Sequence, residues 1–207
     1  MEIRAALAGN PNCGKTTMFN ALTGANQYVG NWPGVTVEKK EGKVRTKESK
    51  EEKIKVTDLP GVYSLSPYTL EEVVSRDYIL NEDPDVIINL VDATNIERNL
   101  YLTTQLTETG VPVVIALNMA DLIRKRGMKI DKKRLSELLN CPVIETSALK
   151  KTGLKELIEE TVCTVKSGEK SIPKAIFSKE LEAAIRAVEE LLPTWIDERK
   201  KRWYAVK

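Results

Sequence analysis

The segment Gly9–Thr16, GNPNCGKT, combines residue types that bind the phosphates of a nucleotide when they occur at this spacing. Gly9 and Gly14 allow backbone N–H groups to turn towards phosphate oxygens, and Lys15 adds a positive charge. The hydroxyl of Thr16 is a hard oxygen ligand of the kind that Mg²⁺ prefers. A chance glycine turn is the alternative. The apolar run before the segment and the helical pattern after it favour a phosphate-binding loop.

A second motif, DLPG, begins at Asp58, where another apolar run ends. In an open α/β sheet, ligands bind at the carboxyl ends of the strands. We therefore expect Asp58 to hold Mg²⁺ through a water molecule, and Gly61 to bring its backbone N–H close to a γ-phosphate. The motif alone is weak, because Asp and Pro-Gly are also common in ordinary turns.

Two more motifs, NMAD at Asn118–Asp121 and TSAL at Thr146–Leu149, also follow apolar runs. The carboxylate of Asp121 can accept hydrogen bonds from N1–H and the 2-amino group of guanine. Adenine has neither donor, so it would leave the carboxylate unpaired, and such selection can be strong. The TSAL segment offers backbone donors to the guanine oxygen. A helix cap is the alternative for either motif.

The alternation of apolar and helical segments predicts an α/β fold with a mostly parallel, doubly wound sheet. Strands are expected over Ile3–Ala8, Lys53–Asp58, Val86–Asp92, Val113–Asn118 and Val143–Glu145. Helices are expected over Lys15–Leu22, Leu70–Leu80, Ile96–Thr109, Lys132–Leu139 and Leu154–Val165. The mostly charged segment Val37–Thr46, which runs through KESKEEK into the next strand, is interpreted as an antiparallel edge hairpin.

The pattern changes near residue 165, and we expect a first domain at 1–165 and a small helical domain at 166–207. Helices are expected over Ser178–Leu192 and Trp195–Val206. The chain ends in ERKKRWYAVK. This segment fits a solvated helix face with Trp203 packed on Trp195, and it equally fits contact with a membrane surface.

Composition limits the classes of function. The 32 Lys and Arg nearly balance 30 Asp and Glu, which argues against a main domain that binds nucleic acid. The chain has no histidine, and Cys13, Cys141 and Cys163 are dispersed, so neither a zinc site nor a disulfide framework is expected. No apolar stretch approaches the length of a membrane helix, and we expect the chain as given to be soluble.

Taken together, the four motifs resemble those of the Ras-like, translation-factor-related P-loop GTPases. Two longer segments are similar to the amino-terminal cytosolic GTPase domain of the FeoB ferrous iron transporters: GNWPGVTVEKKEG at Gly30–Gly42 and DLPGVYSLSPYTLEE at Asp58–Glu72. The tail is similar to the small helical domain of that family. The resemblance implies Mg²⁺-dependent hydrolysis of GTP to GDP and phosphate that regulates or drives ferrous iron transport.

The same resemblance implies a location and partners. The full-length protein would lie at the cytoplasmic face of the cell membrane, and this piece would act with a transmembrane region outside the sequence given. Small accessory iron-transport proteins are further expected partners, and the chain is compatible with an oligomer. No nucleic acid is expected.

The resemblance also places a first switch loop at Ala25–Thr36, with the switch itself at Asn26–Val37. In such proteins a threonine of this loop contacts Mg²⁺ and the γ-phosphate, and Thr36 matches it. A plain turn at Pro33–Gly34 beside an exposed Trp32 is the alternative. The length of the loop favours a functional role.

Two positions depart from the common GTPase pattern. Val62 follows DxxG, where many GTPases carry a glutamine that orients the attacking water, so Val62 cannot perform that task. Met119 stands where many have a lysine whose stem lies over the base, and methionine can still pack there. A second switch is expected at Leu59–Thr69.

Family members with an asparagine at the position of Asn12 are often activated by K⁺. A K⁺ ion held there would stabilise transition-state charge, as an arginine finger does elsewhere. The alternative is that the Asn12 side chain simply braces the loop. Cys13, in the same loop beside a helix amino terminus, is interpreted as a small side chain in a variable position, with a redox-sensitive thiol as the alternative, and Cys141 and Cys163 are interpreted as small core residues.

The expected nucleotide-binding residues are Gly9, Asn10, Asn12, Cys13, Gly14, Lys15, Thr16, Thr17, Thr36, Asp58, Gly61, Asn118, Met119, Asp121, Ser147, Ala148 and Leu149. The expected Mg²⁺ ligands are Thr16, Thr36 and Asp58, and Asn12 is the expected K⁺ ligand. Catalytic roles are expected for Asn12, Lys15, Thr36 and Gly61.

Three functions of other kinds stay open. A free-standing GTPase of the ribosome-assembly type would need an RNA-binding module or a basic face. A noncatalytic guanine-nucleotide-binding module is suggested by Val62. An ATP-using P-loop enzyme would require that ATP compete with GTP for the site.

Overall fold

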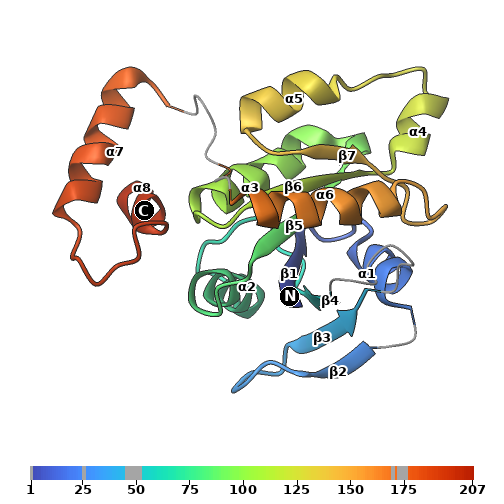
Figure 1. The fold of residues 1–207 in the computed structure, drawn as a ribbon, viewed down its shortest axis with the longest axis horizontal. Helices are drawn as coiled ribbons and strands as arrows, with labels where there is room; N and C mark the ends of the chain where they lie inside the picture. The colour runs from blue at the N-terminus through green and yellow to red at the C-terminus, as the bar shows by residue number, and fades with distance from the viewer. Residues whose placement is uncertain (1, 25–26, 45–52, 169–170, 172–176) are drawn as a thin grey trace.

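The computed structural model describes residues 2–24, 27–44, 53–168, 171 and 177–207. Its centre is a seven-stranded sheet with the strand order β2-β3-β4-β1-β5-β6-β7 (Figure 1). The strands are β1 (Glu2–Gly9), β2 (Gln27–Asn31), β3 (Glu38–Lys43), β4 (Lys53–Asp58), β5 (Val86–Asp92), β6 (Val113–Asn118) and β7 (Val143–Glu145).

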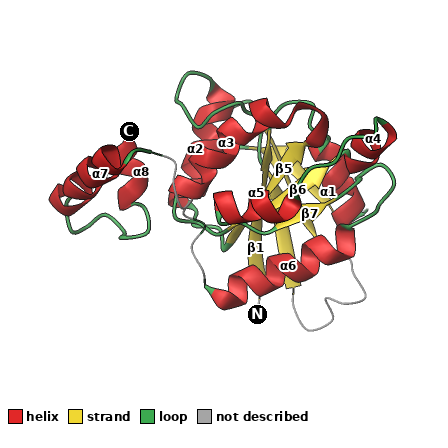
Figure 2. Cartoon of the chain, turned by 90° about the horizontal axis from the view of Figure 1, so that it is seen from above, coloured by secondary structure: helices red, strands yellow, loops and turns green. Residues whose placement is uncertain are grey.

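Helices lie on both faces of this sheet, as Figure 2 shows from above. They are α1 (Lys15–Thr23), α2 (Leu70–Asn81), α3 (Ile96–Glu108), α4 (Ala120–Lys125), α5 (Lys132–Leu139), α6 (Leu154–Ser167), α7 (Lys179–Leu191) and α8 (Lys201–Val206), with a short 3₁₀ turn, η2 (Ala93–Asn95). Several of these helices begin with an N-cap residue whose side chain accepts a backbone N–H of the first turn. For example, the hydroxyl of Thr69 accepts the N–H of Glu72 at 3.1 Å at the start of α2.

Five neighbouring strands, β4, β1, β5, β6 and β7, pair in parallel, so their carboxyl ends lie at one edge of the sheet. That edge carries Gly9, Asp58, Asp92, Asn118 and Glu145, the last residues of the five strands. Parallel strands need crossover helices, and the alternation of strands and helices along the chain supplies them. The edge is where ligands of open α/β sheets bind.

Alternate residues of the central strands enter two separate apolar clusters. On β1, Ala6 and Ala8 face one cluster, while Ala5 and Leu7 face the other. Residues of α1 and α6 complete the second cluster, and residues of α2, α3, α5 and α8 complete the first. The doubly wound arrangement predicted from the sequence is therefore confirmed.

The antiparallel edge has one more strand than predicted. β3 pairs antiparallel with β4, as expected, but β2 forms a second antiparallel strand within the segment interpreted as a loop. Its sequence, QYVGN, is held by pairing with β3 rather than by any apolar alternation of its own. Ala25, Asn26 and the segment 45–52, which includes Thr46, lie outside the described residues.

The tail differs from its prediction in one helix. α7 lies where expected, but the second helix begins only at Lys201 instead of Trp195. Trp203 is 3% exposed and belongs to the first apolar cluster, whereas Trp195 is 82% exposed, so the alternative in which one packs on the other is wrong. A buried Trp203 also cannot serve as an interfacial anchor in this conformation. Among the described residues, none of the helices has the length and apolar character needed to span a bilayer.

Candidate nucleotide-binding site

The phosphate-binding loop follows β1 and ends at the start of α1. Asn12 and Gly14 have positive φ angles of 64° and 92°, so the loop turns sharply before Lys15 begins the helix. A Cβ on Gly14 would lie 2.6 Å from Nδ2 of Asn118, a closeness that only glycine allows. A cavity of about 470 Å³ opens over this loop, and its lining residues are Asn10, Pro11, Asn12, Gly14, Lys15, Thr16, Thr17 and Gly61.

Lys15, the first residue of α1, lies beside Asp58, the last residue of β4. Nζ of Lys15 donates to Oδ1 of Asp58 at 2.9 Å, and both side chains are largely buried. Burial raises the pKa of Asp58, and the positive charge of Lys15 opposes that rise. The carboxylate of Asp58 and the hydroxyl of Thr16 are hard oxygen donors, so the residues present fit Mg²⁺.

Asn118 connects the two halves of the site. Its Nδ2 donates to the carbonyl oxygen of Cys13 at 2.9 Å, and its Oδ1 accepts the N–H of Ala148 at 3.0 Å. The residue is 3% exposed. The sequence predicted that this asparagine belongs to the base-binding motif, and the structure adds that it ties the phosphate loop to the TSAL segment.

Asp121, the predicted base-selecting carboxylate, lies at the start of α4 and forms an ion pair with Lys150 at 2.8 Å. The hydrogen bond from Lys150, aided by one from Ser147, holds the pKa of Asp121 below its ordinary range. Lys150 was missed from the sequence, although it directly follows TSAL. Met119 has a left-handed backbone conformation with a φ of 61°. The side chain of Leu149 is 84% exposed, so it makes little contact with its surroundings.

The predicted switch residues are not all at the cavity. Gly61 lines it, but Thr36 is exposed and does not. Val62 is buried, and its N–H donates to the carbonyl oxygen of Gly9 at 3.3 Å. Its side chain therefore points into the apolar core, in agreement with the prediction that it does not orient water.

Trp32, within the segment predicted as the first switch, is buried, contrary to the alternative in which it is an exposed ring. The side chain is 7% exposed and packs edge-to-face on Tyr78 of α2, with ring centroids 5.3 Å apart. The ammonium of Lys39 lies over the Trp32 ring, 4.7 Å from its centroid. No local pattern predicts this packing, because Trp32 and Tyr78 are distant along the chain.

The second switch segment is tied to α3. The side-chain oxygen of Gln105 accepts the N–H of Leu65 at 2.7 Å. The guanidinium of Arg98 lies 4.0 Å from the ring centroid of Tyr63, and the carbonyl oxygen of the same arginine accepts from Nδ2 of Asn10 at 3.4 Å. The phosphate loop and the segment predicted as the second switch therefore both contact α3.

The three cysteines should differ in reactivity. Cys13 and Cys141 are buried, but Cys163 is exposed, so its interpretation as a core residue is wrong. Burial raises the pKa of Cys13 to about 11, against the opposing charge of Lys15, and raises the pKa of Cys141 to about 12. We expect iodoacetamide at pH 8 to label only Cys163, as measured by intact mass, and to label all three in urea. Rapid labelling of Cys13 in the folded chain would support the redox-sensitive alternative.

The raised pKa of Cys13 also has a consequence for stability. Its folded value of about 11 lies above the ordinary 9.0, so the neutral thiol favours the folded state. That contribution is complete below pH 9 and is lost as the pH rises towards 11.

Comparison with known proteins identifies relatives along most of the chain. The profile of the family described as Ferrous iron transport protein B matches residues 3–161. The Fe(2+) transporter FeoB of Escherichia coli (strain K12) is 40% identical over 210 residues, covering 100% of this chain and 26% of that protein. The FeoB of Legionella pneumophila (strain Paris) is 52% identical over 157 residues, covering 74% of this chain and 20% of that protein. The chain thus spans about a quarter or less of the length of these curated relatives.

Solved structures agree in fold and sequence. An S. thermophilus NFeoB mutant bound to mGDP is 49% identical with a TM-score of 0.92, and the match covers 100% of this chain and 78% of that one. The cytosolic domain of L. pneumophila FeoB is 42% identical with a TM-score of 0.87, over 98% of this chain and 87% of that one. The chain therefore belongs to the ferrous iron transport protein B family and has the Ras-like P-loop fold of its G domain.

Proposed function

We propose that the chain binds GTP with Mg²⁺ and hydrolyses it to GDP and phosphate. The observation that supports this most is the cavity of about 470 Å³ over the phosphate loop, lined by Lys15, Thr16 and Gly61. S. thermophilus relatives solved with GMPPNP and with GDP and aluminium fluoride support it further.

Each residue in this proposal has a chemical task. Lys15 would leave Asp58 and neutralise the β- and γ-phosphates, because both partners form stronger contacts with a nucleotide and its cation. Thr16, Asp58 and Thr36 would hold Mg²⁺, which when bound neutralises phosphate charge. The N–H of Gly61 would donate to the γ-phosphate. Water attacks the γ-phosphorus, the bond to the β–γ bridging oxygen breaks, and GDP leaves with that oxygen.

Base selection provides a test of the proposed ligand. Replacing Asp121→Asn should lower GTP affinity by about 100-fold or more, because two hydrogen bonds from guanine lose their carboxylate. The same variant should gain affinity for xanthosine triphosphate, whose 2-oxo group can accept from the new amide. Titration with fluorescent nucleotides measures both. Asp77→Asn, at a partly exposed position of α2 outside the phosphate cavity, is the matched control, and equal competition by ATP and GTP in the unmodified chain would refute guanine selection.

We further propose that K⁺ activates hydrolysis, with Asn12 as the ligand. Two observations support this proposal: Asn12 is among the residues that line the phosphate cavity, and the buried Val62 cannot orient the attacking water. Single-turnover hydrolysis should be faster in KCl than in NaCl, and Asn12→Ala should remove only that difference. Equal rates in the two salts contradict the K⁺ role, and no hydrolysis in either favours the noncatalytic module.

For the whole protein, we propose that this chain acts at the cytoplasmic face of the membrane, where nucleotide state regulates or drives ferrous iron transport. Residues 1–165 would form the G domain, and residues 166–207 a helical domain that relays its state to a transmembrane region. Accessory iron-transport proteins would be further partners. Lys15→Met in the complete transporter should abolish iron uptake while the protein still reaches the membrane. Normal uptake would show that transport does not depend on the nucleotide.

A further inference from the structure

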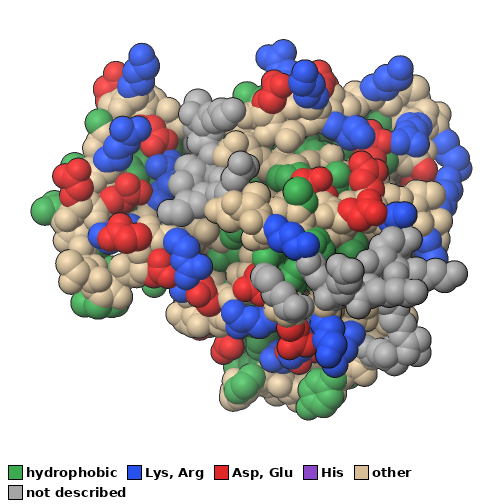
Figure 3. All heavy atoms as spheres, in the orientation of Figure 1, with side chains coloured by type: hydrophobic (Ala, Val, Ile, Leu, Met, Phe, Trp, Pro, Cys, Tyr) green, Lys and Arg blue, Asp and Glu red, His purple; other side chains and the backbone are tan. Residues whose placement is uncertain are grey.

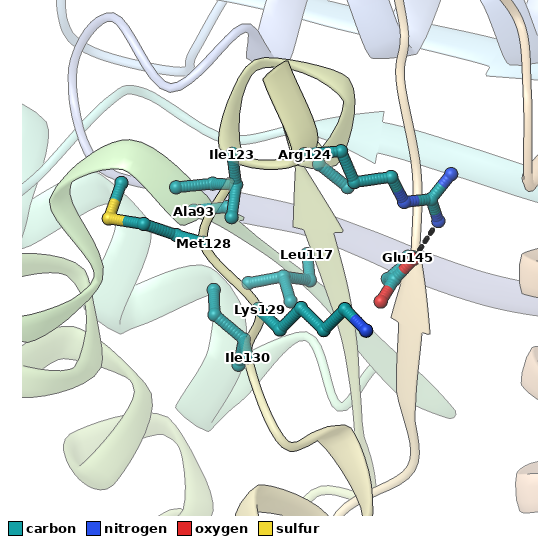
Figure 4. Close-up of a pocket in the computed structure, with 9 residues that line it drawn as sticks. Ala93, Leu117, Ile123, Arg124, Met128, Lys129, Ile130 and Glu145 are labelled. Carbon is teal, nitrogen blue, oxygen red and sulfur yellow. Dashed lines mark hydrogen bonds and ion pairs between the residues drawn. The ribbon is translucent and has the colours of Figure 1, made fainter. Parts of the chain in front are cut away.

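A second cavity, of about 270 Å³, lies beside the base-recognition residues but shares no lining residue with the phosphate cavity (Figure 4). It is bounded by η2, the end of β6, α4 with the segment after it, and the end of β7. None of its lining residues belongs to the set predicted to bind nucleotide. It is therefore a separate place for a ligand.

The inner wall of this cavity is apolar. Ala93, Leu117, Ala120 and Ile123 are each at most 8% exposed, and Met128 and Ile130 add apolar surface nearer the solvent. The volume is about nine times the ~30 Å³ share of one water molecule in the liquid. Such a space suits an apolar body of about six to eight carbon atoms.

The mouth of the cavity is basic. Figure 4 shows the Arg124–Glu145 pair and the ammonium end of Lys129 on one side, with the apolar residues opposite. Glu145 also faces Lys132 at 4.0 Å, so its single charge is already shared. Lys129 is exposed, and it has no ion pair among the described residues. One positive charge is thus left to meet an incoming anion.

Basic side chains gather around this mouth beyond those that line it. Residues 124–134, RKRGMKIDKKR, contain seven Lys and Arg and one Asp. Figure 3 shows Lys and Arg side chains concentrated over α4, while the two signs of charge mix over the rest of that face. The local field therefore attracts anions to the opening of an apolar cavity.

We propose that this cavity binds a medium-chain monocarboxylate, with its hydrocarbon body against Leu117 and Ile123 and its carboxylate at Lys129. A carboxylate stays near water because full burial of a charge is costly, so the cation belongs at the mouth, where Lys129 lies. A nucleotide does not suit this cavity, because its phosphates and sugar would lose their hydration against an apolar wall.

The proposal is tested on the 207-residue chain by calorimetric titration with the sodium salts of butyric, hexanoic and octanoic acids. Each methylene that enters the cavity should raise affinity about threefold to fourfold until the space is filled. Octanol, which has the same body without the charge, should bind about threefold to fivefold more weakly than octanoate. Saturating GDP should leave octanoate binding intact.

Two variants and a control test whether octanoate binds in this cavity. Ala93→Leu should fill the cavity and abolish octanoate binding, with unchanged circular dichroism. Lys129→Met should weaken octanoate about threefold to fivefold and leave octanol unaffected. Lys125→Met removes a neighbouring exposed charge that does not line the cavity, and it should have no effect. Absence of octanoate binding, displacement by GDP, equal binding of octanol, or retention by Ala93→Leu would each overturn the proposal.

Discussion

Replacing Asn118→Ala should destabilise the chain by about 2–4 kcal/mol and lower its affinity for guanine nucleotide by well over tenfold. The substitution leaves the carbonyl of Cys13 and the N–H of Ala148 without their partner, and each unpaired buried group costs about 1–3 kcal/mol. Urea unfolding with an unchanged m-value measures the first effect. Fluorescent nucleotide titration of the folded variant measures the second.

Asn89 is a matched control for this experiment. It is 1% exposed, its Oδ1 accepts from the hydroxyl of Thr103 at 2.6 Å, and its Nδ2 donates to the carbonyl oxygen of Ala8 at 3.5 Å, so its bonds join β5 to α3 and β1 rather than one loop to another. Asn89→Ala should therefore lose comparable stability and keep nucleotide affinity. If both variants lose affinity in proportion to stability, Asn118 is only a structural residue and does not position the two loops.

The second large effect is expected at Trp32. Trp32→Ala removes a nearly buried indole from its packing against Tyr78, and such truncations cost about 3–5 kcal/mol. We expect a loss near the lower end, about 3 kcal/mol, because the segment lies at the edge of the sheet. The midpoint of urea unfolding measures it.

Trp32→Phe should be far milder. Nε1 of Trp32 is buried and has no hydrogen-bond partner among the described residues, so phenylalanine removes an unsatisfied donor while it keeps the aromatic contact. A loss of less than about 1 kcal/mol is expected. Equal stability of the Ala variant and the unmodified chain would mean that the first switch is not held by this packing.

The parallel strands could be predicted from the sequence because each is a short, mainly apolar run, and the central pair β5 and β6 is buried on both faces. β5 and β6 begin and end where they were expected, at Val86–Asp92 and Val113–Asn118. β2 could not be predicted in the same way, because an edge strand is defined by its partner β3 and shows no pattern of its own. The short helix α4 was missed for a similar reason: six residues give too little periodicity.

For the site, the motifs predicted which loops meet but not the contacts between them. The bond between Asn118 and Cys13 joins residues 105 positions apart, and no local pattern encodes such a contact. The ion pair of Lys15 with Asp58 likewise depends on the alignment of β1 and β4. The burial of Trp203 depends on how the tail folds back on the first apolar cluster. The sequence alone therefore could not distinguish packing on Trp195 from contact with a membrane surface.

The basic segment 124–134 makes the molecule an electric dipole. The whole chain has a net charge of only +2, so the residues outside this segment are net negative. The field of a charged surface exerts a torque on a molecule whose charges are separated in this way, and so orients it as it diffuses nearby. Salt screens this field beyond about 10 Å at 0.1 M. A protein that is almost neutral in total can therefore still approach an anionic surface with α4 foremost.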